Sequence, residues 1–437
     1  MSRRVTVTLA AAGLLLSMVA LPAAGEKGPP EQRGDSAGAA AAAHADARRS
    51  QAGSLASQLR GGAGHSGVGE VWSLDQGTDL IHVYRGGAHR EIATIDVSPT
   101  ALAEAGFEHA PTSERTVPHM IEFDSEGRYA FIASTAGAST IVIDARTKRV
   151  LDVLPTGAGS HHAAVTPDDT TVWVAAIGAE QMVEIALDLD ARPPSFTIER
   201  RLDVADLLGP LEAEHGWDFP SYSPVCHQFS PDSSEAWVTL GPGWDQGGLF
   251  VLDLGSGTAS HAWDPEEVRA NCGVSVTDDT AIVNWSGVVS EGADTDGVWY
   301  VFDREGKELL GSHSSRGFDA HGVRLNPAGT HYWMVNRNSD NALVVDAESF
   351  EVVREIEDIA DTPDILDFSP DGSLLYITQR GPTPISGAIH AATGEQPGVA
   401  IIDTETGEAI GVLEPPEVTN EAGDVINDVH GVAVRAR

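Results

Sequence analysis

From residue 71 onward, short apolar strands alternate with turns rich in Asp, Gly and Pro, and this pattern recurs along the chain. A typical repeat is "DILDFSPDGSLLYITQ" followed by "VAIIDTETGEAIGVL", and six segments have this order of strand, turn, strand, strand and short fourth strand. Period-two alternation between tight turns is typical of antiparallel sheets. Because repeats of four such strands are typical of propeller blades, the pattern predicts a β-propeller.

The two ends of the repeat region each hold only part of a blade. The C-terminal "DVHGVAVRAR" matches a first strand, whereas the N-terminal "EVWSLDQGTDLIHVYRGGAHREIATIDV" matches the second, third and fourth strands. Pairing these pieces in one sheet gives a seventh blade and removes exposed sheet edges. The sequence therefore predicts an all-β fold, a seven-bladed β-propeller over residues 68–437 that is closed by a composite blade.

The first 67 residues have a different composition. Residues 1–25 hold Arg3 and Arg4, then an apolar run too short to span a bilayer, then small residues, which is the layout of a secretory signal peptide. The Arg pair also fits a twin-arginine signal. Residues 26–67 are rich in Gly, Ala and Ser and predict a flexible linker. We expect a secreted or periplasmic protein with no membrane attachment after cleavage.

Charge and missing motifs exclude several classes of partner. The chain carries a formal net charge of -38, which repels nucleic acid and anionic membrane surfaces. The sequence contains no phosphate-binding loop and no Cys-x-x-Cys-His motif, so we expect neither a nucleotide nor haem c. The expected partner is a small molecule or an extracellular protein at the mouth of the central channel, and the expected state is a monomer.

Two repeats carry a resemblance to a known family. The segments "SPDGSLLYITQ" and "YAFIASTAGASTIVIDARTKRVLDVL" resemble the YVTN-type β-propeller repeat, and the resemblance covers about residues 70–437. It implies the propeller fold but not one function, since that family includes surface proteins, lactonase-like enzymes and the propeller domains of haem and copper reductases.

One position in the repeats is rich in metal-binding residue types. Five residues before each first-strand turn stand His119, His161, Val225, Cys272, His321, Asp364 and His430. His227 lies two residues after Val225 and therefore faces the same side of its strand. First strands line the channel of a propeller, so the sequence predicts a ring of imidazoles at the channel mouth. The longest loops are also predicted on this face, and loops often carry function.

Imidazole is a ligand for copper, zinc, iron and nickel. The ring resembles that of the copper-cluster propeller domain of nitrous oxide reductase, which also has a His-His pair. By that resemblance the ligand candidates are His119, His161, His162, His227, His321 and His430. Cys272 and Asp364 occupy the same register and are further candidates. Copper is the expected metal, with zinc or calcium as alternatives, and no second, cysteine-rich copper domain is expected.

Each of these residues also has a structural interpretation. A histidine at this register can donate a hydrogen bond to the backbone of a neighbouring blade. Cys226 and Cys272 fall at nearly matching positions in adjacent blades, so they are expected either to form a disulfide in an oxidising compartment or to leave Cys272 as a ligand. His162 faces away from the ring unless a β-bulge lies there.

Three further side chains are candidates for binding a substrate. Arg337 and Arg380 stand at equivalent ends of second strands, where they bind an anionic substrate or pair with acidic residues. Trp217 is expected to cover the channel mouth. Three functions follow: an exported copper protein with oxidoreductase activity, a non-catalytic extracellular scaffold, or a lactonase-like metal-dependent hydrolase.

Overall fold

The computed structural model describes residues 67–436 except 242–245, 272 and 291. The predicted signal peptide over residues 1–25, residues 26–66 of the predicted linker, and Cys272 lie outside the described residues.

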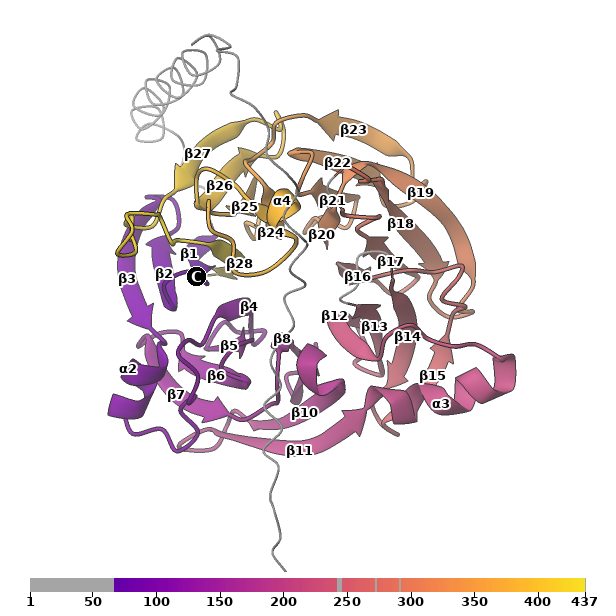
Figure 1. Ribbon diagram of the computed structural model, residues 1–437, viewed down its shortest axis with the longest axis horizontal. Helices are drawn as coiled ribbons and strands as arrows, with labels where there is room; N and C mark the ends of the chain where they lie inside the picture. Colours follow the sequence, from indigo (N-terminus) through magenta and orange to yellow (C-terminus); the bar gives the residue numbers. More distant parts are fainter. Residues whose placement is uncertain (1–66, 242–245, 272, 291, 437) are drawn as a thin grey trace, which may run out of the picture. The chain divides into compact units, whose positions relative to one another are not determined.

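In the described part of the chain, 28 strands form seven antiparallel sheets of four strands, arranged around a common axis (Figure 1). The composite blade contains β28 (Val429–Ala436), β1 (Val68–Asp75), β2 (Leu80–Arg85) and β3 (Arg90–Asp96). The next two blades contain β4 (Pro118–Phe123), β5 (Tyr129–Ser134), β6 (Ser139–Asp144) and β7 (Arg149–Leu154), then β8 (Ser160–Val165), β9 (Thr171–Ala176), β10 (Gln181–Asp188) and β11 (Ser195–Asp203).

The remaining four blades follow in chain order. They contain β12 (Ser223–Phe229), β13 (Glu235–Gly241), β14 (Gly248–Asp253) and β15 (Thr258–Ala262); β16 (Val274–Val276), β17 (Thr280–Trp285), β18 (Asp296–Asp303) and β19 (Leu309–Phe318); β20 (Ala320–Leu325), β21 (His331–Asn336), β22 (Asn341–Asp346) and β23 (Val352–Ile356); and β24 (Pro363–Phe368), β25 (Leu374–Gln379), β26 (Gly398–Asp403) and β27 (Ala409–Leu413). The predicted seven-bladed propeller is confirmed.

The predicted closure of the ring is also confirmed. β1 pairs antiparallel with β28, and Trp72 lies opposite Ala433 in the register. The pairing joins the two ends of the repeat region through backbone hydrogen bonds, so neither end leaves an unpaired inner strand.

The core lies between the blades, where large side chains of the middle strands are buried. Trp72, Trp173, Trp237 and Trp299 are fully buried. A cation lies over the indole face in three cases, as with Lys148, whose Nζ is 5.0 Å from the Trp72 ring centroid. Burying an aromatic side chain of this size stabilises the blade contacts, and a cation over the ring face adds a favourable electrostatic contact.

A β-bulge lies near the start of the first strand in six blades. The register shifts in β4, β8, β12, β20, β24 and β28. In β8 the shift falls between Ser160 and His162. A bulge places two residues opposite one and changes the direction of the strand. The alternation that would turn His162 directly away from His161 is therefore broken.

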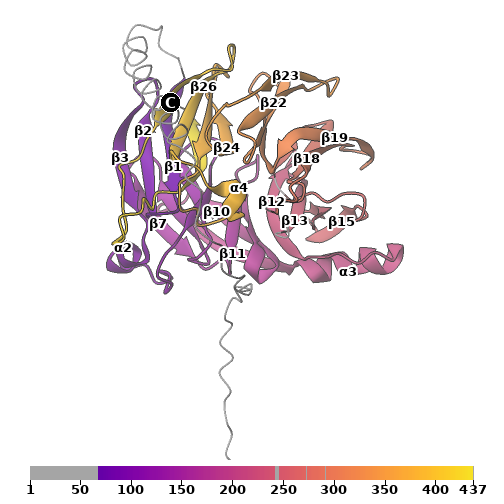
Figure 2. The same cartoon turned by 45° about the horizontal axis from the view of Figure 1, so that its top comes forward.

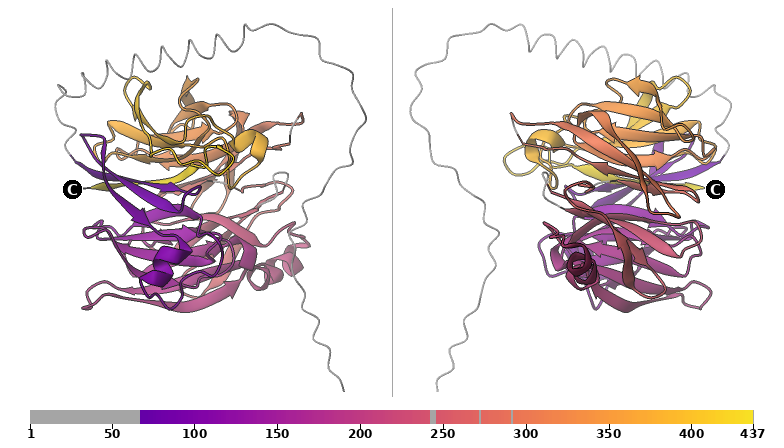
Figure 3. Two further views of the ribbon diagram at one scale, coloured as in Figure 1. Left: turned by 60° about the vertical axis from the view of Figure 1, so that its left-hand side comes forward. Right: turned by 90° about the vertical axis from the view of Figure 1, so that its right-hand side faces the viewer.

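The helices are short and lie in the connections between or within blades. They are α2 (Pro99–Glu104), the 3-10 turn η1 (Ile177–Ala179), α3 (Val204–His215) and α4 (Ile389–Ala392). α2, α3 and α4 lie in connections that end at the beginning of a first strand or that join second to third strands, which is the face where long loops were predicted (Figure 2; Figure 3). None of the helices in the described residues has the length and apolar composition needed to cross a bilayer.

Candidate metal centre

Four histidines and one aspartate from five blades meet near the propeller axis. The set, called here the His–Asp cluster, consists of His119 on β4, His161 on β8, His321 on β20, Asp364 on β24 and His430 on β28. Asp364 is 0% exposed, and His119 and His430 are 2% exposed. The structure thus brings together five of the residues predicted at one register, and it buries three of them, His119, Asp364 and His430.

Three side chains of the cluster converge on one point. Asp364 Oδ1 lies 3.1 Å from His321 Nε2, and Asp364 Oδ2 lies 3.6 Å from His430 Nε2. One ligand atom from each of the three residues lies within 4.8 Å of the others. Asp364 Oδ1 and His321 Nδ1 are buried and make no hydrogen bond with a described residue. Buried polar atoms without partners are costly unless something binds them.

His119 and His161 are joined by hydrogen bonds that fix their protons. The Gln76 amide donates from Nε2 to His119 Nδ1 at 2.6 Å, so His119 carries its proton on Nε2. His119 Nε2 then donates to His161 Nε2 at 2.7 Å, and His161 Nδ1 donates to the carbonyl of Val225 at 2.9 Å. In this arrangement neither imidazole of the pair has a free Nε2 lone pair, and their predicted role as ligands stays a prediction.

His430 has the opposite arrangement. Its Nδ1 donates to the backbone carbonyl of His119 at 3.0 Å, so the Nε2 of the neutral ring carries a lone pair. That lone pair faces Asp364 Oδ2. Two electron-rich atoms face each other here, and a cation between them would turn this repulsion into binding. The predicted contacts from register histidines to neighbouring blades are confirmed for His161 and His430.

Burial sets the protonation of the cluster. Desolvation is the largest cause that lowers the pKa of His161 to about 3 and of His430 to about 4, and it also holds the pKa of His119 and His321 well below the usual value. Burial alone raises the pKa of Asp364, but Arg337 and then His430 hold it well below the usual range. At neutral pH the cluster offers neutral imidazoles and an ionised carboxylate, the forms that bind metals.

Arg337 and Arg380 anchor the aspartate. Arg380 donates from Nη1 to Asp364 Oδ2 at 2.8 Å and from Nε to Asp428 Oδ1 at 2.7 Å. Arg337 donates from Nε to Asp319 Oδ2 at 2.7 Å and lies 3.3 Å from Asp364 Oδ2. Of the two roles expected for these arginines, the contacts show the pairing with acids. Both guanidinium groups are buried away from the solvent.

Sequence reasoning missed Asp319, Asp428 and Gln76. A signal for the two aspartates was present, because "DAHG" and "DVHG" place an Asp two residues before His321 and His430. Trp217 lies elsewhere: it stacks on His215 at a centroid distance of 4.3 Å, beside α3, and packs against the hydrophobic cluster beneath that helix. These contacts place Trp217 beside α3 and not over the channel mouth, where it was predicted.

The adjacent histidines belong to different groups. His162 Nδ1 accepts from the backbone N–H of His227 at 3.3 Å, and His162 Nε2 donates to Glu122 Oε1 at 3.4 Å. His227 Nε2 donates to the carbonyl of Trp173 at 3.1 Å. His162 and His227 therefore lie outside the His–Asp cluster and line the channel that continues beyond it.

The cysteines give no ligand in the described residues. Cys226 is buried and forms no disulfide with a described residue, and burial, followed by Asp364 and Glu122, raises the pKa of its thiol to about 12. Cys272 lies outside the described residues, so its predicted disulfide with Cys226 and its predicted role as a ligand stay predictions.

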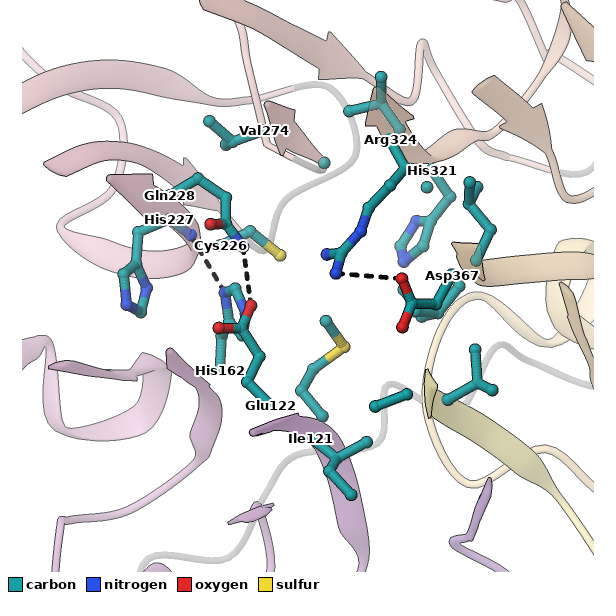
Figure 4. A pocket seen from close by; sticks show the side chains of 18 of the residues that line it. Ile121, Glu122, His162, Cys226, His227, Gln228, Val274, His321, Arg324 and Asp367 are labelled. Atoms are coloured by element: carbon teal, nitrogen blue, oxygen red, sulfur yellow. Dashed lines mark hydrogen bonds and ion pairs between the residues drawn. The ribbon is translucent and has the colours of Figure 1, made fainter. Parts of the chain in front are cut away.

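The channel beyond the cluster contains a cavity of about 240 Å³ (Figure 4). Its wall includes His162, Cys226 and His321 near the cluster, and Arg324 and Asp367 farther along the first strands. His321 thus belongs to the His–Asp cluster and also lines the cavity.

Comparisons with known proteins support the fold. No family model matches the chain, and no curated protein matches it. Among solved structures, the chain is similar to Kuenenia stuttgartiensis hydrazine synthase, with 13% identity and a TM-score of 0.53 over 75% of this chain and 90% of that one. It is also similar to dihydro-heme d1 dehydrogenase NirN in complex with DHE, with 14% identity and a TM-score of 0.50 over 84% of this chain and 75% of that one. At these identities the likeness shows the propeller fold alone.

Proposed function

We propose that this protein is an exported metal-binding β-propeller that holds one transition-metal ion at His321, Asp364 and His430. The observation that carries the proposal is the lone pair of His430 Nε2 facing the ionised carboxylate of Asp364, with Asp364 Oδ1 buried beside His321 and without a hydrogen bond to a described residue. A divalent cation would satisfy all three groups at once.

Copper is the metal we propose. Two imidazoles and one carboxylate suit copper, zinc and iron, and among divalent ions of the first row such sites bind Cu²⁺ most tightly. Calcium prefers six to eight oxygen ligands, and the three residues supply one carboxylate. The likeness to the copper-cluster domain of nitrous oxide reductase favours the same metal, although the hydrogen bonds support three ligands rather than six histidines.

The chain's own residues set up the site. Arg337 and Arg380 bind Asp364 through Oδ2 and leave Oδ1 directed at His321. The carbonyl of His119 orients His430 by accepting from Nδ1. Such partners fix ring orientation and tautomer for ligation. Bound copper would supply one-electron redox chemistry, which makes an oxidoreductase the enzyme class we propose.

One observation favours a non-catalytic function instead. Asp364, Arg380 and Asp428 form a buried ion-pair network that joins the blade of β24 and β25 to the loop before β28 without any metal. Holding the propeller closed would then be the sole role of this network, as in an extracellular scaffold. The signal-like N-terminus is the basis for proposing that either protein acts outside the cytoplasm.

Metal analysis tests the proposal. The purified mature protein is dialysed against copper and against zinc, and bound metal is measured by mass spectrometry together with the electron paramagnetic resonance spectrum. We expect one copper per chain, lost in His321→Ala and His430→Ala. His331→Ala on β21, whose Nδ1 contacts only Thr330 among the described residues, is the matched control. Folded wild-type protein that binds neither metal would rule out the site, and zinc alone would favour a hydrolase.

A further inference from the structure

The cavity in the channel lies on the side of the His–Asp cluster away from the long loops. In the blades that contribute to the cluster, its lining residues other than His321 stand one to four positions beyond the cluster residue along the chain, as Arg324 does after His321. On the loop side the cluster is covered by buried ion pairs. Arg324 has a side chain that is 43% exposed, which indicates that the cavity opens to solvent at its far end. Ligands therefore reach the cavity from the face of short turns.

One wall of the cavity carries the guanidinium group of Arg324, and only part of its N–H donors are used in contacts with described residues. Arg324 Nη2 lies 3.1 Å from Asp367 Oδ1, its only ion pair with a described residue. The same carboxylate accepts backbone N–H groups, from Phe368 at Oδ1 and from Val434 at Oδ2. Asp367 is thus fixed by the backbone and holds Arg324 in place. A guanidinium has five N–H donors, so most of those on Arg324 remain for an anionic group.

The opposite wall carries a carboxylate (Figure 4). Glu122 Oε1 accepts from Gln228 Nε2 at 2.8 Å and from His162 Nε2 at 3.4 Å, and Oε2 accepts from the Val165 N–H at 3.3 Å. Burial raises the pKa of Glu122, but His162, Arg324 and Gln228 together outweigh it and the net pKa is lowered, so the group is ionised. A carboxylate accepts about four hydrogen bonds, which leaves room on Glu122 for a cationic donor.

We propose that the channel cavity binds a small zwitterion, with its anionic group at Arg324 and its cationic group at Glu122. The apolar wall between them, which includes Ile121, Val274 and Leu366, suits a short aliphatic spacer. The volume of about 240 Å³ is below the roughly 300–1,000 Å³ of sites for drug-sized ligands, so the ligand is small. Glu122 would repel a purely anionic ligand, and Arg324 would repel a purely cationic one.

Calorimetry on the metal-free protein tests this site apart from the metal. Titration with glycine, β-alanine and γ-aminobutyrate is compared with butyrate and butylamine at low ionic strength. We expect the best of the three zwitterions to bind at least about tenfold more tightly than either monofunctional compound. Equal binding of butyrate, or no saturable binding of any zwitterion, overturns the proposal.

Variants separate the two walls. Arg324→Gln and Glu122→Gln should each weaken the best zwitterion about tenfold or more. Arg316→Gln, which removes an ion pair with Glu355 on an outer strand, should leave binding unchanged. Arg324→Lys keeps the charge and should retain part of the affinity if Arg324→Gln unfolds. Unchanged zwitterion binding in Arg324→Gln would contradict the proposed zwitterion site. The copper content of the same variant is measured separately and tests the metal proposal.

Discussion

Arg380 Nη1 lies 2.8 Å from Asp364 Oδ2, and both side chains are 0% exposed. The same guanidinium binds Asp428, so a residue of β24 and a residue before β28 share one buried cation. The contact takes up one oxygen of Asp364 and leaves the other facing His321. Blade closure and the proposed metal site therefore depend on one carboxylate.

Replacing Asp364 should damage both roles. In Asp364→Asn, Arg337 and Arg380 lose a buried counter-charge, and breaking a buried pair costs about 3–5 kcal/mol. We expect the free energy of unfolding of the metal-free protein to fall by that amount in urea titrations. Asp190→Asn, at an exposed position, should change it by less than about 0.5 kcal/mol. A metal-free Asp364→Asn protein as stable as wild type would show that the pairs contribute nothing.

The metal-free protein should lose stability on acidification. The folded pKa of His430 is about 4, below the value of about 6.5 expected when unfolded. Between these values the unfolded chain binds a proton that the folded chain does not, so the free energy of unfolding falls as pH falls, by up to about 1.4 kcal/mol per pH unit. His430→Gln should flatten this slope in urea titrations, and His109→Gln, at an exposed position, should not.

Metal removal should lower the thermal midpoint of the wild type. Copper at about one hundred times its Kd stabilises the folded state by about 2.7 kcal/mol when it binds that state alone. Scanning calorimetry with copper and with a chelator should therefore give different midpoints for the wild type and similar ones for His321→Ala. An equal copper shift in His321→Ala would place the binding elsewhere.

Gly322→Ala should disturb the cluster through the backbone. A Cβ at this position would lie 2.5 Å from the carbonyl oxygen of Asp364 and 2.8 Å from Leu366 Cδ2. Overpacking of this kind costs about 1–3 kcal/mol. At Gly411 on the outer strand β27 the nearest atom, Ile401 Cδ1, would be 3.9 Å away, so Gly411→Ala is the control and should leave the urea midpoint unchanged or raise it.

The thiol of Cys226 should be unreactive in the folded protein. Its pKa of about 12 leaves almost no thiolate at neutral pH, and the residue is buried. In a Cys272→Ser variant, iodoacetamide should label Cys226 only after unfolding in urea, as followed by intact mass. Rapid labelling of the folded variant would contradict this. The unfolded wild type tests the disulfide, because a bonded pair takes up no label.

The chain pattern determined the propeller because blades repeat the same local information. Turn residues such as Gly372, with φ of 71°, recur between alternating apolar strands, so each blade can be recognised without knowing its neighbours. The same repetition placed His321, Asp364 and His430 at one register and therefore near one point on the axis. Closure by β28 and β1 followed from the two incomplete repeats at the ends.

What each side chain does at that register depended on contacts between blades. Arg337 and Arg380 stand at equivalent sequence positions, but only the fold shows that they bind Asp319, Asp364 and Asp428 rather than solvent. Trp217 packs beside α3, a placement set by the path of a long loop. Pairings between residues far apart in the chain have no local sequence signal.

The neighbours His161 and His162 show most clearly which features the sequence determined and which the tertiary structure decided. The sequence determined that the pair starts an inner strand, since a turn and an alternating apolar run follow it. Only the tertiary structure decided that the bulge in β8 sends His161 to His119 and His162 to Glu122 and His227. The reason is physical: bulge geometry depends on how β8 pairs with β9 and packs between β4 and β12, and those strands come from three different blades.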